Sequence, residues 1–166
     1  QQKEICELLD KSGASLFALL TRLTLREDVA EELMQELFIK LNNYNGLRKI
    51  QCWNAYAHKA AINLAFDWRR KQKRASLSLD NVPETASNVN SPLIDMIHAE
   101  QLQEILNAIG RLSKAPRQAV VMRHIQQQSY EDIAEQMGKT THQVRALCYK
   151  AINRLRYLLG RKRKEI

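Results

Sequence analysis

The side chains whose types and spacing most clearly suggest a binding function lie between Thr141 and Lys150. Apolar residues recur there at helical spacing, at Val144, Cys148, Ala151 and Leu155, which predicts a helix with one narrow buried seam. The opposite face carries His142, Arg145, Ala146, Tyr149 and Lys150. A short, polar and positive face of this kind suits the major groove of DNA, where one bidentate arginine contact contributes about 1 to 3 kcal/mol of base discrimination. A merely solvated helix face is the alternative.

The residues before this helix predict how it is positioned. Ser129 can cap a helix whose first turn carries Glu131 and Asp132, matching the positive end of the helix dipole. Gly138 supplies the left-handed conformation that ends such a helix. Thr140 and Gln143 have the spacing of a capping box for the next one. The pattern therefore predicts two helices joined by a tight turn, a helix-turn-helix.

A second candidate surface lies between Val29 and Leu41. The segment is amphipathic, with Val29, Leu33, Leu37 and Leu41 predicted to face inward. The opposite face carries Glu32, Gln35, Glu36 and Ile39. An isoleucine among acidic residues in a basic protein suggests contact with another protein rather than with DNA. A single stray exposed apolar residue is an equally good interpretation.

The third candidate is the helix predicted from Cys52 onward. Its inward stripe consists of Trp53, Ala57, Ala60, Leu64 and Trp68, and the residues away from that stripe are Lys59, Ile62, Asn63, Phe66 and Arg70. Apolar side chains next to basic residues and an asparagine are suited to binding the unstacked nucleobases of a single strand. Packing against another helix is the alternative for Ile62 and Phe66, and for Phe66 it is the favoured one. Five of the six residues from Arg69 to Arg74 are basic, and we expect them to contact backbone phosphates.

The chain divides into two halves of similar charge. Residues 75–91 are rich in Ser and Asn, contain two acidic residues and have no basic one, which predicts a flexible linker. Residues 1–74 hold 13 basic and 9 acidic residues, and residues 92–166 hold 13 basic and 7 acidic residues. We therefore expect two nucleic-acid-facing domains, at 1–74 and 92–166, each of which contacts DNA separately.

Composition bounds the remaining possibilities. With five glycines, three prolines and apolar residues mostly three or four apart, the 166-residue chain is predicted to be all-α. A net charge of +8 favours nucleic acid as the partner, then a membrane surface, although many basic proteins bind neither. No apolar run is long enough to span a membrane, so we expect no membrane insertion and a cytoplasmic location.

The sequence offers no sign of catalysis. Its three cysteines and four histidines are scattered, with no pair at metal-ligand spacing, and the common nucleotide-binding and hydrolase motifs are missing. We therefore predict no metal, no cofactor and no enzymatic activity.

The segment "LSKAPRQAVVMRHIQQQSYEDIAEQMGKTTHQVRALCYKAINRLRYLLG" resembles region four of bacterial RNA polymerase sigma factors. The positions that carry this likeness are Leu112, Arg117, Tyr130, Ile133, Ala134, Gly138, Val144, Ala151 and Leu155. The resemblance implies that the helix from Thr141 reads the −35 promoter element through Thr141, His142, Gln143, Arg145, Ala146, Leu147, Tyr149 and Lys150. Leu147 stands where the family commonly has a basic residue. It could contact a thymine methyl group or widen the core.

The first half resembles sigma region two. "EELMQELFIKL" is similar to its polymerase-binding helix, and "WNAYAHKAAINLAFDWRRKQKR" to the helix that reads and melts the −10 element. The likeness implies that Glu32, Gln35, Glu36 and Ile39 face the polymerase clamp. It also places Lys59, Asn63 and the loop Asn45–Gln51 against the opened −10 strand, with Arg69, Arg70 and Arg74 on backbone phosphates. Two regions and a short linker resemble the extracytoplasmic-function (ECF) group of the sigma-70 family.

The resemblance implies a sigma subunit of bacterial RNA polymerase, acting in the nucleoid with the core enzyme (clamp and flap) and promoter DNA as partners. It leaves open whether an anti-sigma factor also binds. The rival from another class is a stand-alone helix-turn-helix repressor or activator, which would dimerise and bind palindromic duplex alone. An RNA-binding or nucleic-acid-processing enzyme is a third hypothesis, weakened by the missing catalytic cluster. The first residue is Gln1 rather than Met, which suggests an incomplete N-terminus.

Overall fold

The computed structural model describes residues 2–46, 50–78 and 93–162. All regular secondary structure within these ranges is helical, which confirms the predicted all-α class. The helices are α1 (Gln2–Thr24), α2 (Glu27–Asn42), α3 (Trp53–Ser78), α4 (Leu93–Gly110), α5 (Lys114–His124), α6 (Tyr130–Met137) and α7 (Thr141–Lys162). None of the helices in this described part is both long and apolar enough to cross a bilayer.

The first three helices form a bundle in which α1 packs against both α2 and α3. Its core is built from leucines at helical spacing, and it includes Leu16, Leu20 and Leu23 of α1 with Leu37 and Leu41 of α2, none of which has exposed surface. Burying a leucine side chain contributes about 1.5 to 3 kcal/mol. Small residues on α3, among them Ala57, Ala61 and Ala65, let the helices approach closely and are fully buried.

The last four helices form the second half, in which α4, α5 and α6 all pack against α7. Its core includes Val121 and Met122 of α5, Ile133 of α6, and Val144 and Ala151 of α7, each with no exposed surface. The predicted seam of α7 is therefore confirmed, since Cys148 and Leu155 are buried as well. This core fixes the orientation of α7 and turns its other face outward.

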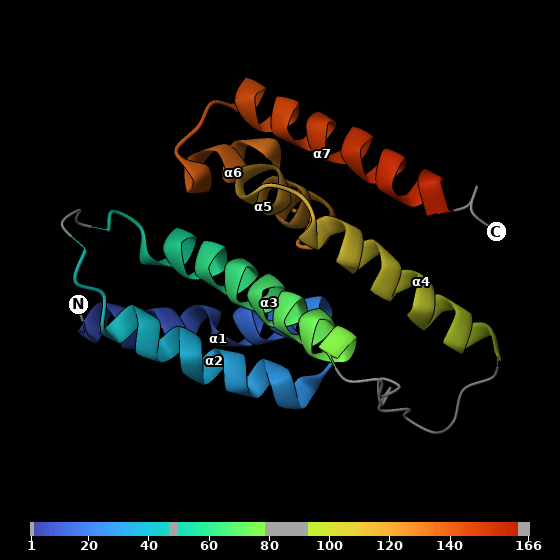
Figure 1. Ribbon diagram of the computed structural model, residues 1–166. Helices are drawn as coiled ribbons and strands as arrows, with labels where there is room; N and C mark the ends of the chain where they lie inside the picture. Colours follow the sequence, from blue (N-terminus) through green and yellow to red (C-terminus); the bar gives the residue numbers. More distant parts are fainter. Residues whose placement is uncertain (1, 47–49, 79–92, 163–166) are drawn as a thin grey trace.

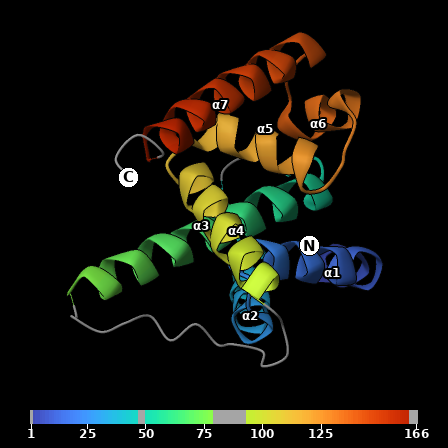
Figure 2. The same ribbon diagram turned by 90° about the vertical axis from the view of Figure 1, so that its right-hand side faces the viewer.

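The two halves pack against each other along α3. Figures 1 and 2 both place α1 and α2 on one side of α3 and α5 to α7 on the other, and α3 contacts α4, α5 and α6. Ile62 and Phe66 are fully buried, so the core-packing interpretation holds for both. Gly110, at the end of α4, packs closely against Phe66, because a Cβ added to Gly110 would lie 3.3 Å from the Phe66 ring.

The boundary between the first domain and the linker was predicted at Arg74, but α3 continues to Ser78. Its exposed last turns, residues 71–77, project beyond the bundle in Figure 2. Most of the predicted linker, residues 79–91, lies outside the described residues, as does the basic end of the chain after Lys162.

Candidate nucleic-acid interface

The turn between α6 and α7 has the predicted chemistry. The Ser129 hydroxyl accepts a hydrogen bond from the Asp132 amide at 3.0 Å and so caps α6. The helix ends at Gly138, whose φ of 62° and ψ of 41° are left-handed, and the Lys139 amide donates to the Ala134 carbonyl at 2.9 Å. Both signals were local, and both are confirmed.

The start of α7 is closed by the predicted capping box. The Thr140 amide donates to Gln143 Oε1 at 3.0 Å, and the Gln143 amide donates to Thr140 Oγ1 at 3.2 Å. Gln143 is exposed, but its side-chain oxygen is committed to this cap in the free protein. Its predicted contact with base edges would therefore have to use the amide nitrogen or break the cap.

Most of the remaining residues of the predicted reading face are exposed, on the side of α7 away from its buried seam. His142, Arg145, Ala146 and Lys150 are exposed, and Tyr149 is 71% exposed. Thr141 is half-buried, and so is Leu147, which packs against the hydrophobic core. Of the two interpretations of Leu147, the structure supports a role in widening the core.

Arg145 is held beside an aromatic ring that the sequence argument had not connected with it. The Arg145 guanidinium carbon lies 5.2 Å from the centre of the Tyr130 ring, and that of Arg123 lies 4.5 Å from the same ring. Arg123 is fixed in turn, because its Nη1 donates to the Gln128 carbonyl at 2.8 Å. Tyr130 thus links the side chain with the greatest base-reading potential to the supporting helices α5 and α6.

A basic hollow continues this surface toward the end of α7. A pocket of about 350 Å³ lies between the start of α5 and α7, and Arg111, Lys150 and Arg154 all line it together with Tyr157. The Arg154 guanidinium carbon lies 5.2 Å from the centre of the Tyr157 ring. Lys150 was predicted to contact DNA, whereas Arg111 was missed because it precedes the helix-turn-helix pattern.

On α3 the predicted DNA contacts divide into two groups. Lys59 and Asn63 are half-buried, and Asn63 Oδ1 lies 3.5 Å from Arg117 Nη2 and 3.4 Å from Gln118 Nε2 of α5. Arg69 is only 8% exposed and donates to acceptors on α1 and α4. In this structure the part of α3 that includes Asn63 and Arg69 therefore faces the second half of the protein.

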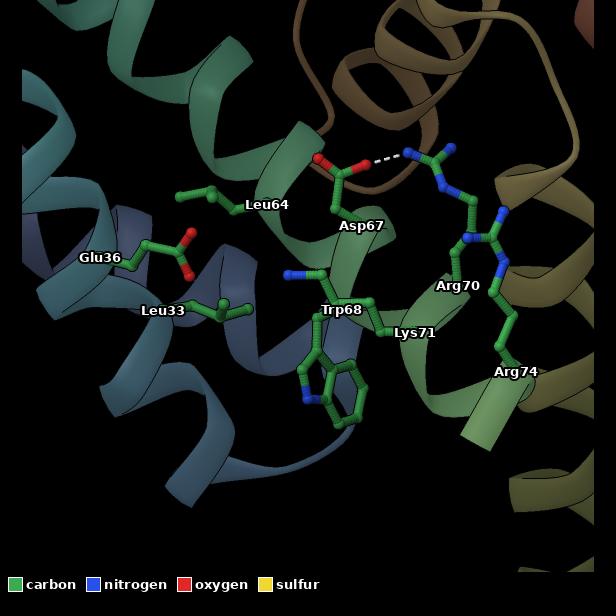
Figure 3. Close-up of a pocket in the computed structure, with 8 residues that line it drawn as sticks. All are labelled: Leu33, Glu36, Leu64, Asp67, Trp68, Arg70, Lys71 and Arg74. Atoms are coloured by element: carbon green, nitrogen blue, oxygen red, sulfur yellow. Dashed lines mark hydrogen bonds and ion pairs between the residues drawn. The ribbon is translucent and has the colours of Figure 1, made fainter. Parts of the chain in front are cut away.

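The other group reaches solvent. Arg70 and Arg74 line a pocket of about 270 Å³ between α2 and α3, and Arg70 forms an ion pair with Asp67 at its rim (Figure 3). Figure 3 shows Glu36 of α2 and Lys71 of α3 pointing toward one another across this pocket. The predicted protein-binding and phosphate-binding surfaces of the first half thus meet at one hollow of mixed charge.

The face of α2 that was predicted to bind a protein is exposed to solvent. Glu32, Gln35 and Glu36 are exposed, and Ile39 is 57% exposed. Phe38 beside it is 42% exposed, so the apolar part of this face is larger than one stray residue. Phe38 could have been found from the sequence, because it lies off the inward stripe of leucines. A pair of exposed large apolar residues among acidic ones supports the protein-contact interpretation.

Asn45 is exposed just before α3, while residues 47–49 of its predicted strand-binding loop lie outside the described residues. Beside it, the rings of Tyr44, Trp53 and Tyr56 pack edge to face with centroids 5.3 to 6.2 Å apart. Gly46 lies so close to Tyr44 that an added Cβ would be 2.1 Å from the Tyr44 hydroxyl. This aromatic cluster was not part of the predicted site, and Tyr44 directly precedes Asn45 in the chain.

Comparison with known proteins shows what the chain is similar to. Residues 102–155 match the family model described as sigma-70, region 4. The ECF RNA polymerase sigma-E factor of Haemophilus influenzae is 28% identical over 154 residues, which cover 87% of this chain and 81% of that protein. The RNA polymerase sigma-E factor of Streptomyces avermitilis is 25% identical over 130 residues, covering 76% of this chain and 69% of its own length.

Among solved structures, one similar chain is the sigma factor RpoE of Bartonella quintana, determined in complex with the anti-sigma factor NepR. It matches with a TM-score of 0.47 and 23% identity over 96% of both chains.

An all-α fold with a capped helix-turn-helix and an exposed basic face on its second helix is typical of DNA-binding transcription proteins. The match to region 4 and the sigma-E relatives narrow that class. Residues 102–155 thus match sigma-70 region 4, and over most of its length the chain is similar to RNA polymerase sigma-E factors, one of them of the extracytoplasmic-function type.

Proposed function

We propose that the chain is a non-catalytic subunit of bacterial RNA polymerase that binds the core enzyme in the cytoplasm and directs it to promoters with a −10 and a −35 element. In this proposal α7 reads the −35 element, α3 and the loop before it bind the opened −10 strand, and α2 docks on the clamp. The domains of residues 1–74 and 92–166 act on separate stretches of DNA.

The observation that carries the proposal is the reading face of α7. Its seam is buried, its N-terminal turn is closed by a capping box, and Arg145 stands exposed beside Tyr130. A guanidinium held at the surface of a helix can donate two parallel hydrogen bonds to a guanine edge. The basic hollow formed by Arg111, Lys150 and Arg154 lies on the same helix and suits the neighbouring phosphates.

For the −10 strand, the support comes from exposed and aromatic groups at the start of α3. Asn45 is exposed beside the cluster of Tyr44, Trp53 and Tyr56, and aromatic rings stack on unpaired bases with about 1 to 3 kcal/mol per base. Melting would then be driven by capture of separated bases, without a hydrolysed cofactor. Asn63 and Arg69 can take part only when the second half moves away from α3.

Reconstituted transcription tests the proposal. Core polymerase alone and core polymerase with this chain are given a library of promoter sequences, and the transcripts are sequenced. We expect specific initiation only with the chain, at templates that share two short motifs at a fixed spacing. If the chain neither associates with core polymerase nor changes where transcripts begin, the proposal fails.

Two substitutions separate the roles of the two halves. Arg145→Ala removes the principal base contact and should weaken recognition of the upstream motif while leaving affinity for core polymerase nearly unchanged. Glu36→Lys reverses a charge on the exposed face of α2 and should lower affinity for core polymerase in a pull-down. Equal loss of both activities in either variant would contradict this division of labour.

The rival hypothesis, a stand-alone helix-turn-helix regulator, predicts a dimer that binds palindromic duplex without polymerase. The sigma-E relatives and the match to region 4 favour the sigma subunit instead. Sizing the free protein and measuring its duplex binding with and without core polymerase distinguishes the two.

A further inference from the structure

The contact between the two halves is organised around Arg69 of α3. Its guanidinium donates to the Leu23 carbonyl of α1 at 3.2 Å, to Gln103 Oε1 of α4 at 2.6 Å and to Asn107 Oδ1 of α4 at 2.9 Å. Arg69 is 8% exposed. One side chain therefore ties the end of α1 and the middle of α3 to α4, across the boundary between the halves.

A second set of contacts covers the predicted −10-reading residue Asn63. Its Oδ1 accepts from Arg117 and Gln118 at 3.5 and 3.4 Å, which are long for hydrogen bonds and therefore weak. Arg117 is better held by packing, because it is 5% exposed and its guanidinium carbon lies 5.4 Å from the centre of the Phe66 ring. We attribute most of the directional energy of the contact to Arg69 and the rest to packing around Phe66.

These contacts bury two cations against neutral acceptors. Arg69 binds only carbonyl and amide oxygens in the hydrogen bonds described above, and neither its Nε nor that of Arg117 has a hydrogen-bond partner in the described part of the chain. A guanidinium in such surroundings is less well stabilised than one paired with an anionic phosphate or carboxylate. The closed arrangement is therefore specific in geometry yet easily exchanged for contacts with a nucleic-acid backbone.

We propose that α4 and the start of α5 are the intramolecular occupant of the −10-reading face of α3, and that Arg69, with Gln103 and Asn107, forms a latch that holds the free chain closed. With the latch closed, Asn63 and Arg69 are covered and the opened strand cannot reach them. Promoter engagement exchanges the amide acceptors of Arg69 for phosphate. This consequence rests on the proposed function, whereas the latch itself does not.

Matched glutamine substitutions on α4 test the latch. Gln103→Lys places a cation opposite Arg69, and Gln101→Lys adds the same charge two residues away at an exposed position of the same helix. Asn107→Asp gives Arg69 an anionic acceptor and should strengthen closure. Circular dichroism confirms that each variant is helical before it is compared.

Small-angle X-ray scattering of the full chain reads out closure. A compact chain of 166 residues has a radius of gyration of about 15 Å, whereas two separated halves of this size give about 20 Å or more. We expect wild type, Gln101→Lys and Asn107→Asp to be compact and Gln103→Lys to be expanded. An expanded wild type, or a Gln103→Lys variant as compact as Gln101→Lys, overturns the latch.

Binding of a fluorescein-labelled single-stranded DNA carrying the −10 motif selected in the transcription experiment tests the consequence. If about nine-tenths of the free chain is closed, opening it strengthens apparent affinity on the order of tenfold. Gln103→Lys should then bind about tenfold more tightly than Gln101→Lys, and Asn107→Asp more weakly than wild type. If Gln103→Lys expands but binds no more tightly than Gln101→Lys, closure does not restrict DNA binding and that part of the inference is overturned.

The two proposals fail in different ways. If wild type is compact and Gln103→Lys expands it, but the chain does not direct transcription, the latch is retained and the proposed sigma function is lost. A chain that directs transcription but is expanded as wild type retains the function and loses the latch.

Discussion

At the scale of single residues, Tyr130 connects the supporting helices to α7, the proposed reading helix. Two guanidinium groups, Arg123 and Arg145, approach the same ring, and Arg123 is anchored to a backbone carbonyl. A long arginine side chain has many rotamers, and restricting them before DNA arrives reduces the entropy lost on binding. Tyr130 should therefore position Arg145 without touching a base itself.

Replacing Tyr130 by Leu keeps an apolar side chain and removes the ring face. Since an exposed cation–π contact contributes about 0.5 to 1 kcal/mol, binding to the upstream motif should weaken about two- to fivefold. Tyr130→Phe retains the ring and is the matched control. Affinities of holoenzyme for a cognate duplex and for one substituted at the base pair read by Arg145 provide the measurement. Indistinguishable affinities for the Leu and Phe variants would show that the ring does not position Arg145.

His58 makes stability depend on pH. It is 5% exposed within α3, and burial lowers the pKa of its imidazole below the ordinary value of 6.5, an effect only partly offset by its contact with the Asn54 carbonyl at 3.0 Å. Because the unfolded chain binds this proton more readily than the folded one, stability is lost as pH falls through about 6.5.

Urea unfolding at pH 7.5 and 5.5 should therefore show a smaller loss of stability for His58→Gln than for wild type. Glutamine stays neutral across this range and can still donate to the Asn54 carbonyl. His98→Gln, at an exposed position of α4, serves as the control and should lose as much stability as wild type. A His58→Gln variant with an unchanged pH dependence would assign the loss to other groups.

At the scale of elements, the turn between α6 and α7 depends on the backbone conformation of Gly138. No atom lies within 4 Å of a Cβ built there, so a substitution meets no steric obstacle from neighbours, yet φ is 62°. An L-residue in the left-handed region costs about 1 to 2 kcal/mol. Gly13, in the middle of α1, also has open space around an added Cβ, but its backbone is helical.

Gly138→Ala and Gly13→Ala should consequently shift stability in opposite directions. The first should destabilise by about 1 to 2 kcal/mol because of its positive φ, and the second should stabilise by about 0.5 to 1 kcal/mol because alanine is the better helix former. Denaturant midpoints of the two variants and wild type provide the measurement. A shift of the same sign in both would mean that backbone conformation is not the deciding difference.

The elements also show what could be predicted from the sequence. The Ser129 cap, the left-handed Gly138 and the capping box each depend on residues no more than four positions apart. Local sequence patterns were therefore sufficient to predict all three. The outer face of α3 was ambiguous because its partners, Gly110 and Arg117, are more than 40 residues away. Arg69 was predicted to contact phosphate because it lies in a run of basic residues. The sequence of such a run is the same whether or not one of its side chains turns into the protein.

At the scale of the whole molecule, closure brings together two halves of like charge. Residues 1–74 carry a net charge of +4 and residues 92–166 a net charge of +6. Repulsion between the halves opposes the latch, and its range depends on salt, since the Debye length is about 30 Å at 0.01 M and about 8 Å at 0.15 M. The hydrogen bonds of Arg69 end on carbonyl and amide oxygens, and contacts with neutral groups are weakened less by salt than ion pairs are.

The sign of the salt dependence therefore distinguishes the two forces. If neutral acceptors hold the latch and charge opposes it, raising salt from about 0.01 to 0.15 M should make wild type more compact, because the repulsion is screened. Ion pairs between the halves would give the opposite result, expansion on adding salt. Scattering at both ionic strengths is the measurement, with Asn107→Asp as the internal comparison. Its new ion pair with Arg69 should favour the compact form most at low salt, where screening is weakest, so Asn107→Asp should become less compacted by added salt than wild type does.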